Sequence, residues 1–262
     1  MDLGLNGKRA IVTGGSRGIG KQCALALARE GVQVCIAART QDTLNQALTE
    51  INQTGHKGHA VAGDLTTQAN CEKVVQATIS RFGGVDILVN NVGAARNADI
   101  LELSPGLIDD ALALKTYSYL RMSQLVIPHM KENRWGRIIN IAGSAGTSPT
   151  RGNIPTGAAN ITILNITRAL SDAVSGDGIL VNTVCPGLTN TGRARTQQGA
   201  RAEREGRDIE ELLEALGQEL PAGRIAEPEE VANVVTFLAS EACSYMFGTA
   251  LYMDGGKRRA TP

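Results

Sequence analysis

Short apolar runs alternate with helix-spaced apolar patterns along almost the whole chain of 262 residues. The run at residues 10–13 is followed by a helical pattern over 18–30, and further apolar runs follow at 32–37 and 85–89. These runs are continuously apolar, which is typical of parallel strands that helices cover on both faces. Strands that alternate with helices through short connections predict an α/β fold, a Rossmann-type doubly wound parallel sheet in three layers (α/β/α).

The second half of the chain continues this pattern. Helical patterns occupy residues 107–131 and 158–174, and no repeat or linker divides the chain, so we expect residues 1–262 to form a single domain. The segment at about 190–221 differs, because it is rich in Arg, Glu, Gln and Gly and has one helical pattern near 209–216. An insertion of this kind in a compact sheet protein predicts a lid over a site.

Charge and cysteine content exclude several classes of function. The 26 basic residues balance the 26 acidic ones, so no net field favours nucleic acid or an acidic membrane. Five scattered cysteines form no CxxC pair and no Cys/His cluster, which predicts buried reduced thiols and no metal site. The chain begins without an apolar signal core and has no stretch long enough to span a membrane, so we expect a soluble cytoplasmic protein.

A glycine-rich turn joins the first predicted strand to the first predicted helix. Glycines allow the backbone to approach a pyrophosphate closely, and the helix N-terminus supplies N–H groups and a partial positive charge. We therefore expect a dinucleotide to contact Gly14, Ser16, Arg17, Gly18, Ile19 and Gly20.

The end of the second predicted strand indicates which dinucleotide is bound. An NAD site usually has an acidic residue there, but this chain has Ala37, Ala38, Arg39 and Thr40. Arg39 would pair with a 2′-phosphate that a carboxylate would repel, and Arg17 can reach the same phosphate. The sequence therefore predicts NADP(H). A solvated strand-end charge is the alternative for Arg39, and the missing acid argues against it.

Five segments in the expected order resemble the short-chain dehydrogenase/reductase family over roughly residues 5–256. They are the Gly-x-x-x-Gly-x-Gly turn, the residues 63–65, 90–93 and 186–191, and the C-terminal residues 252–256. The resemblance implies that the second segment contacts the adenine, the third backs the adenosine ribose and the fourth holds the nicotinamide carboxamide. It adds to the cofactor site Asp64, Leu65, Asn91, Gly93, Pro186, Gly187, Thr189 and Thr191.

The catalytic residues of that family are replaced in this chain. Family members have a Ser, a Tyr thirteen residues later and a Lys four residues after that, but the matching positions hold Gly143, Thr156 and Asn160. A family Asn on the preceding long helix is matched by Lys115. An aliphatic hydroxyl is far less acidic than a phenol, so Thr156 is a poor proton donor. Asn160 could still bind the nicotinamide ribose.

Lys115 leads to a hypothesis about the site. An ammonium on that helix could take over the charge that is lost at Asn160, and desolvation there would lower its pKa and make it a proton donor or an oxyanion partner. The alternative is a lysine that extends from an interfacial helix toward solvent. Ser144 is a candidate for binding the carbonyl or for capping a loop, and Tyr119, one helical turn after Lys115, for supplying a phenol or for packing.

Three functions remain open at this point. The first is an NADP(H)-dependent oxidoreductase that acts on a small carbonyl or alcohol substrate with a non-standard active site. The others are an inactive NADP(H)-binding sensor or partner subunit, and a non-redox isomerase or lyase. Arg96 and Arg151 are expected to flank the cleft. Together with the arginines of the insertion they would suit an acidic or CoA-type substrate, although interleaved glutamates favour a salt-bridged lid. These insertion arginines are Arg193, Arg195, Arg201, Arg204 and Arg207. The family resemblance implies a homo-oligomer, a tetramer or a dimer.

Overall fold

The computed structural model describes residues 2–93, 96 and 98–259 of the chain. Its strands are β1 Arg9–Thr13, β2 Gln33–Ala38, β3 His59–Ala62, β4 Ile87–Asn90, β5 Gly136–Ile141, β6 Ile179–Pro186 and β7 Ala250–Met253. Its α-helices are α1 Gly18–Arg29, α2 Gln41–Asn52, α3 Gln68–Phe82, α4 Pro105–Ala111, α5 Ser118–Glu132, α6 Ile154–Val174, α7 Gly192–Glu205, α8 Ile209–Gln218 and α9 Pro228–Ala239. Shorter turns are the π-helix η1 Leu112–Tyr117 and the 3₁₀ segments η2 Ser144–Gly146 and η3 Ser175–Asp177.

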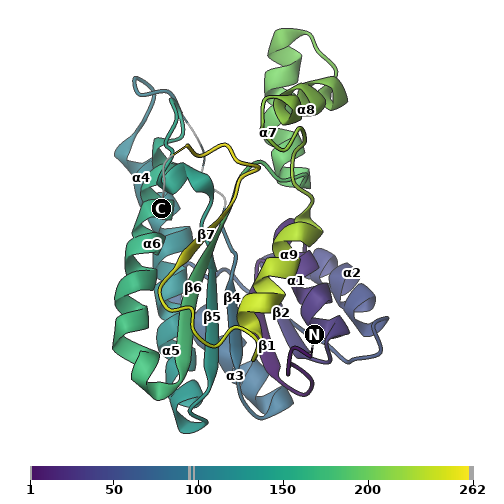
Figure 1. Cartoon of the computed structure of the whole chain (residues 1–262), viewed down its shortest axis with the longest axis vertical. Coiled ribbons are helices and arrows are strands. Elements are labelled where there is room, and N and C mark those ends of the chain that lie inside the picture. The colour runs from purple at the N-terminus through teal and green to yellow at the C-terminus, as the bar shows by residue number, and fades with distance from the viewer. Residues whose placement is uncertain (1, 94–95, 97, 260–262) are drawn as a thin grey trace.

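The described strands form one parallel sheet in the order β3-β2-β1-β4-β5-β6-β7. Helices cover both faces of this sheet (Figure 1). The predicted doubly wound, three-layer α/β fold is therefore confirmed. The chain reverses its direction of strand addition between β1 and β4, and in such sheets ligands bind at the carboxyl ends of the strands beside this switch point.

Two buried apolar clusters attach the helices to the sheet. One joins α1, α2 and α9 to the face that carries Val12, and the other joins α3, α5 and α6 to the face that carries Ile11. Successive residues of β1 thus enter opposite layers, as the pleat of a strand requires. The five cysteines are all buried and free, in agreement with the prediction of reduced thiols.

Three elements differ from the sequence prediction. The helix expected at 107–131 is divided into α4, η1 and α5, and the π-helical turn η1 carries Lys115. The helix expected from residue 158 begins at Ile154, because Pro155 occupies its first turn. The insertion contains two helices, of which α7 was missed, because Ala194 and Ala202 are its buried residues and give it no apolar stripe.

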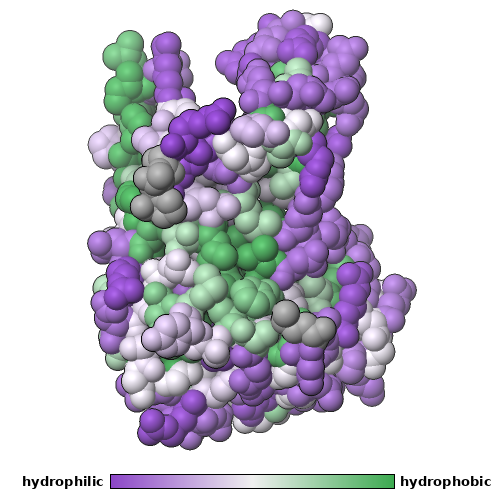
Figure 2. Space-filling view, viewed as in Figure 1, coloured by the Kyte–Doolittle hydropathy of each residue, from purple (hydrophilic) through white to green (hydrophobic). Residues whose placement is uncertain are grey.

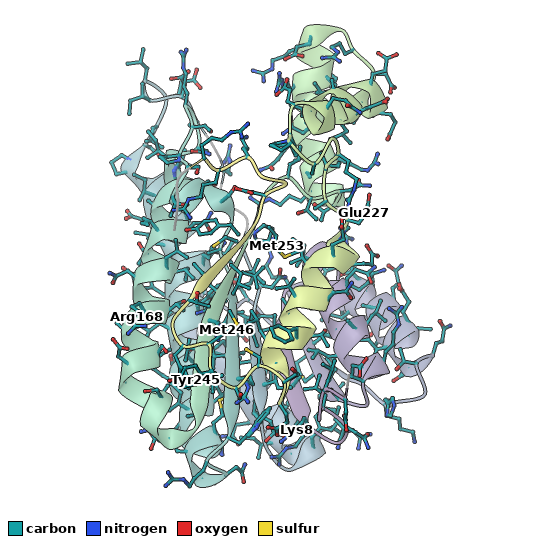
Figure 3. All side chains as sticks on the ribbon, in the orientation of Figure 1. Lys8, Arg168, Glu227, Tyr245, Met246 and Met253 are labelled. Atoms are coloured by element: carbon teal, nitrogen blue, oxygen red, sulfur yellow. The ribbon has the colours of Figure 1, made fainter. Side chains whose placement is uncertain are left out.

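The segment between α9 and β7 is attached to β6 and α6 by hydrogen bonds between side chains and backbone groups. Asn182 Nδ2 donates to the Met246 carbonyl at 2.8 Å, and Thr249 N–H donates to Asn182 Oδ1 at 3.1 Å. Arg168 of α6 donates to the Phe247 carbonyl at 3.2 Å, and Figure 3 shows Arg168, Tyr245 and Met246 along this side of the molecule. These contacts hold β7 in register beside β6.

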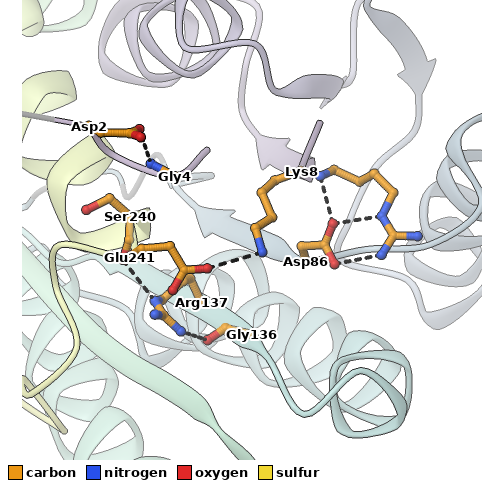
Figure 4. A network of polar contacts seen from close by, with 9 residues as sticks. Asp2, Gly4, Lys8, Asp86, Gly136, Arg137, Ser240 and Glu241 are labelled. Carbon is orange, nitrogen blue, oxygen red and sulfur yellow. Dashed lines mark hydrogen bonds and ion pairs between the residues drawn. The ribbon is translucent and has the colours of Figure 1, made fainter. Parts of the chain in front are cut away.

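An ion pair links the first residue of β1 to the residue before β4, at the amino ends of these strands. Asp86 accepts from Arg9 through two guanidinium bonds of 2.7 Å and one backbone N–H bond of 2.9 Å (Figure 4). The carboxylate of Asp86 is buried, and its hydrogen bond is the main reason why the pKa of Arg9 is raised. Removing one member of such a pair leaves the other member without its counter-charge.

Asp86→Ala is therefore expected to lower the free energy of unfolding by about 3 kcal/mol, the lower end of the range for broken buried pairs, since Arg9 keeps partial contact with water. Urea denaturation measures this change. Asp172→Ala is the matched control, because Asp172 pairs with Arg168 across one turn of an exposed helix face. That pair should contribute at most about 0.5 kcal/mol. Equal effects of the two substitutions would contradict the role assigned to Asp86.

Candidate functional site

The turns after β1 and β4 are joined by side-chain hydrogen bonds at the switch point. The backbone N–H of Asn91 donates to Thr13 Oγ1 at 2.9 Å, and Asn91 Nδ2 donates to the carbonyls of Thr13 and Gly14 at 3.1 and 3.3 Å. Gly14 and Gly18 have φ values of +64° and +53°, which only glycine adopts without strain. The glycine-rich turn is thus fixed on one side by the turn after β4.

Gly20 has a packing role in this turn. A Cβ atom at this position would lie 2.3 Å from the Gly14 carbonyl oxygen and 2.4 Å from Asn91 Nδ2. The first turn of α1 therefore packs directly on the glycine-rich turn. No side chain caps α1 at Arg17, so the N–H groups of its first turn are available to an anion.

A cleft of about 760 Å³ runs along the carboxyl ends of the strands. Of the residues predicted to bind the cofactor, it is lined by Gly14, Ser16, Arg17, Gly18, Ile19, Arg39, Asp64, Leu65, Asn91, Gly93 and Thr191. Gly20, Pro186, Gly187 and Thr189 are not among its lining residues, and Asn160 lies in an adjoining side pocket. Asp64 is the one acidic residue among the described residues that line the cleft.

Thr189 and Gly187 have packing roles and are absent from the described lining of the cleft. Thr189 is buried and donates its hydroxyl to the Gly187 carbonyl at 3.2 Å. A Cβ atom at Gly187 would lie 2.8 Å from the Cα atom of Asp254, so the chain needs glycine here for close packing. Thr191 follows, lines the cleft and caps α7 by accepting from the Ala194 N–H at 3.1 Å. This segment therefore positions the start of α7 against the cleft.

Lys115 and Asn160 meet in the side pocket, which Thr156 also lines. Lys115 Nζ, in η1, donates to Asn160 Oδ1, in α6, at 2.6 Å, although the two residues lie 45 positions apart in the chain. The amide nitrogen of Asn160 faces Gly143, where an added Cβ atom would lie 3.1 Å from it. Asn160 thus fills the space beside Gly143 with its nitrogen and binds the lysine with its oxygen.

The environment of Lys115 changes its acidity. Its side chain borders the cleft, but protein atoms surround its amine. This desolvation, together with the positive charge of Arg193, lowers the pKa of Lys115 to about 7, while the Cys185 side chain acts in the opposite direction. A group with this pKa is divided between ammonium and amine at neutral pH, which suits proton transfer. Its position in a π-helical turn is a further feature that is frequent at functional sites.

The side chains of Tyr119 and Ser144 do not line the side pocket that holds the Lys115 amine. The Tyr119 hydroxyl is buried and donates to the Ile141 carbonyl at 3.1 Å, while its ring lies 5.9 Å from Lys115 Nζ. Burial raises the pKa of Tyr119 well above its usual value, which makes this phenol a weak proton donor. Ser144 begins η2, where its carbonyl accepts from Thr147 and Ser148, and it lines neither the cleft nor the side pocket.

Arg193 is a site residue that the sequence did not single out. It is the second residue of α7, its guanidinium donates to the Gly93 carbonyl, and it lines both the cleft and the side pocket. The signal that could have found it is its position two residues after Thr191, at the start of a helix that faces the cleft. The many other arginines of α7 hid that signal.

The helices α7 and α8 project as an arm beyond the carboxyl ends of the strands (Figure 1). The visible face of this arm is largely hydrophilic (Figure 2). Arg195 pairs with Glu210, and Arg201 donates to Glu205 at 2.6 Å. The expected salt-bridged insertion is thus present. Arg151, expected to flank the cleft, pairs instead with Asp99 at 3.2 Å and is 88% exposed.

Within residues 2–93, 96 and 98–259, no helix has the combined length and apolarity that crossing a membrane requires. Over the same ranges, no three His, Cys, Asp or Glu side chains gather as a metal site would need.

Comparison with known proteins gives full-length matches. The family model described as enoyl-(acyl carrier protein) reductase matches residues 14–258. The 3-oxoacyl-(acyl-carrier-protein) reductase FabG of Vibrio cholerae serotype O1 is 34% identical over 254 residues, which covers 97% of this chain and 98% of that protein. The D-beta-hydroxybutyrate dehydrogenase of Cupriavidus necator is 33% identical, with 96% and 98% covered.

Solved structures have the same architecture. The L-sorbose reductase of Gluconobacter frateurii, solved in complex with NADPH and L-sorbose, has a TM-score of 0.96 and 32% identity, and all of both chains is covered. An actinorhodin polyketide ketoreductase with NADPH has a TM-score of 0.92 and 30% identity, with 97% of this chain and 98% of that chain covered.

Proposed function

The chain belongs to the short-chain dehydrogenase/reductase family of oxidoreductases, and we propose that it is an NADP(H)-dependent member that acts on a small carbonyl or alcohol substrate with a non-standard set of catalytic residues. The observation that carries this proposal is the amine of Lys115 at 2.6 Å from Asn160, in a pocket that adjoins a cleft of dinucleotide size. Bound NADPH supplies the hydride.

The cleft fits a phosphorylated dinucleotide along its length. The uncapped first turn of α1 suits the pyrophosphate, and the cleft is long enough to run from Arg39 to Lys115. Arg17 and Arg39 line its adenosine end and would hold the 2′-phosphate. The turn after β4 would back the adenosine ribose, and Asn160 would bind the nicotinamide ribose. Two structural relatives are described in complex with NADPH, which supports the same cofactor here.

Lys115 is the proton donor in this proposal. Its ammonium would bind the carbonyl oxygen of the substrate, stabilise the negative charge that develops there and release a proton to it. Asn160 orients the amine through the 2.6 Å bond, and Thr156 offers a hydroxyl in the same pocket. Because Tyr119 and Ser144 have other bonds or other positions, the amine of Lys115 is the group best suited to this step. The arm of α7 and α8 would close the cleft as a lid.

Binding and turnover must be measured together to test this function. We expect tight NADPH binding in a fluorescence titration and NADPH consumption with at least one member of a broad panel of ketones, aldehydes and oxo acids. Tight NADPH binding without turnover on any carbonyl compound would favour a non-catalytic sensor or partner subunit. Absence of NADPH binding would reject the cofactor assignment.

A further inference from the structure

Two positive side chains, Lys115 and Arg193, lie where the side pocket adjoins the cleft, which we call the inner end of the cleft. Arg193 donates to the Gly93 carbonyl, and Lys115 packs over Gly93 so closely that an added Cβ atom there would lie 3.4 Å from its Cδ atom. They come from different elements, since Lys115 lies in η1 and Arg193 begins α7. Both line the cleft and the side pocket, so they stand where these two spaces join.

No acidic side chain occurs among the described residues that line the side pocket. Its described residues are Gly93, Ala111, Lys115, Thr156, Ala159, Asn160 and Arg193, and none of them is acidic. Their neutral polar groups are the Thr156 hydroxyl and the Asn160 amide. Like charges held close together beside desolvated protein atoms repel each other, as the effect of Arg193 on Lys115 indicates. An anion between the two side chains would offset this repulsion.

We propose that Lys115 and Arg193 form a binding site for the carboxylate of an oxo-acid substrate. This inference rests on the proposed function and names the substrate class of the same site. A guanidinium binds a carboxylate through two parallel hydrogen bonds, so Arg193 would hold the carboxylate in the plane of its guanidinium. The ammonium of Lys115 would bind a carboxylate oxygen and the carbonyl oxygen together, since the two lie close in a small oxo acid.

A cofactor phosphate is the other possible source of negative charge, and the lining residues argue against it. Arg17, Gly18 and Arg39 line the cleft but not the side pocket, whereas Lys115 and Arg193 line both. The residues suited to the pyrophosphate and the 2′-phosphate are therefore distinct from the pair at the inner end. The site thus has separate positions for the anions of the cofactor and for an anion of the substrate.

The charge of Lys115 makes the proposed binding depend on pH. The titratable groups near its amine are Arg193, the Cys185 thiol and the Tyr119 phenol. Burial raises the pKa of Cys185 to about 12 and that of Tyr119 well above its usual value, so both stay neutral near pH 7. Because Lys115 has a pKa of about 7 in the free protein, a carboxylate should bind with uptake of a proton above that pH.

The experiment is isothermal titration calorimetry of acetoacetate and pyruvate against their uncharged methyl esters. Titrations are run on the full chain with and without NADP⁺, which cannot donate hydride, so no turnover occurs. We expect each acid to bind at least about tenfold more tightly than its ester. Between pH 7 and 8 its affinity should fall by up to about tenfold, with proton uptake at pH 8 measured in buffers of different ionisation enthalpy.

Variants identify the side chains responsible. Arg193→Gln and Lys115→Met should each weaken acid binding by about tenfold or more and remove most of the preference over the ester. Arg195→Gln is the matched control, because Arg195 lies on the same helix but pairs with Glu210 and bonds to Asn190. It should bind the acids as the wild type does.

Two outcomes would overturn the inference. Equal binding of acids and esters would exclude a carboxylate site. If Arg193→Gln and Lys115→Met weaken NADPH or inorganic pyrophosphate as much as the oxo acids, the anion belongs to the cofactor. Failure of the proposed function can be told apart from failure of this inference. The first appears as a lack of NADPH binding or turnover, whereas the preference for acids over esters is also measured without cofactor.

Discussion

Replacing Lys115 with methionine is expected to lower kcat for NADPH-dependent carbonyl reduction by at least about 100-fold, because a positioned proton donor contributes about 10²–10⁴ in rate. The physical reason is the position of its amine, which lies 2.6 Å from Asn160 at the inner end of the cleft. Methionine keeps a similar length and apolar stem but can neither donate a proton nor bind an oxyanion. Steady-state kinetics on any substrate that the wild type reduces measures the loss.

The pH dependence of the wild type tests the same role with a defined sign. Reduction needs the ammonium form, and the pKa of Lys115 is lowered to about 7. The value of kcat/KM should therefore be flat at low pH and fall about tenfold per pH unit on the alkaline side. Bound NADPH carries negative charge and raises the pKa of the ammonium, so the midpoint in the binary complex lies at or above pH 7. Alcohol oxidation should show the opposite trend.

Lys131→Met is the matched control for this experiment. Lys131 lies at the end of α5, on the same helical run, and pairs with Asp177 at the surface at 2.7 Å. Its replacement should leave kcat unchanged, and NADPH binding by Lys115→Met should stay measurable, which separates lost chemistry from lost folding. Wild-type turnover by Lys115→Met, or a reduction rate that does not fall at alkaline pH, would reject the lysine as proton donor.

The sheet could be predicted because its signals are local. Continuous apolar runs give strands that are buried on both faces, and the glycine-rich turn marks the junction of β1 and α1. The end of β2 at Ala38 places Arg39 in the cleft without knowledge of any distant contact. These features depend on a few consecutive residues, so a single sequence contains them.

The catalytic side of the site depends on distant contacts, and the sequence predicted it only in part. The bond between Lys115 and Asn160 joins two helices, and only the spacing of a known motif suggested that these residues meet. Spacing does not report the orientation of η2, which keeps Ser144 out of the lining of both spaces. It also does not report the π-helical turn, because the apolar pattern of residues 107–131 fits an ordinary α-helix.

The arm formed by α7 and α8 illustrates why the helices of an insertion are difficult to predict from the sequence. A helix is recognised by its apolar stripe, but α7 projects beyond the sheet and buries little besides Ala194 and Ala202. Its ends are marked by local signals, the Thr191 cap and Gly206 with a φ of +63°. Caps alone do not predict a helix without a buried face, and nothing in the sequence separates Arg193 from the other arginines of the insertion.

Replacing Arg39 with aspartate is expected to reverse the cofactor preference. Arg39 lines the cleft at the end of β2, where the described lining residues of that strand and of the turn after it are Ala37, Ala38, Arg39 and Thr40. Loss of a charge-assisted bond to the 2′-phosphate costs about 1.5–3 kcal/mol, and the new carboxylate adds repulsion, so the Kd for NADPH should rise by at least about 100-fold. NADH has no phosphate there, and aspartate can accept hydrogen bonds from its ribose hydroxyls.

Fluorescence titration with NADPH and with NADH measures the Kd of each. The ratio of the two Kd values reports the cofactor preference. Arg29→Asp is the matched control, because it makes the same change of charge at the exposed last turn of α1, outside the cleft lining. If the loss of NADPH affinity came only from the change in net charge, Arg29→Asp would weaken NADPH binding as much as Arg39→Asp does. If Arg39→Asp binds NADPH as tightly as the wild type, Arg39 is a solvated charge and the 2′-phosphate is held elsewhere, with Arg17 the next residue to replace.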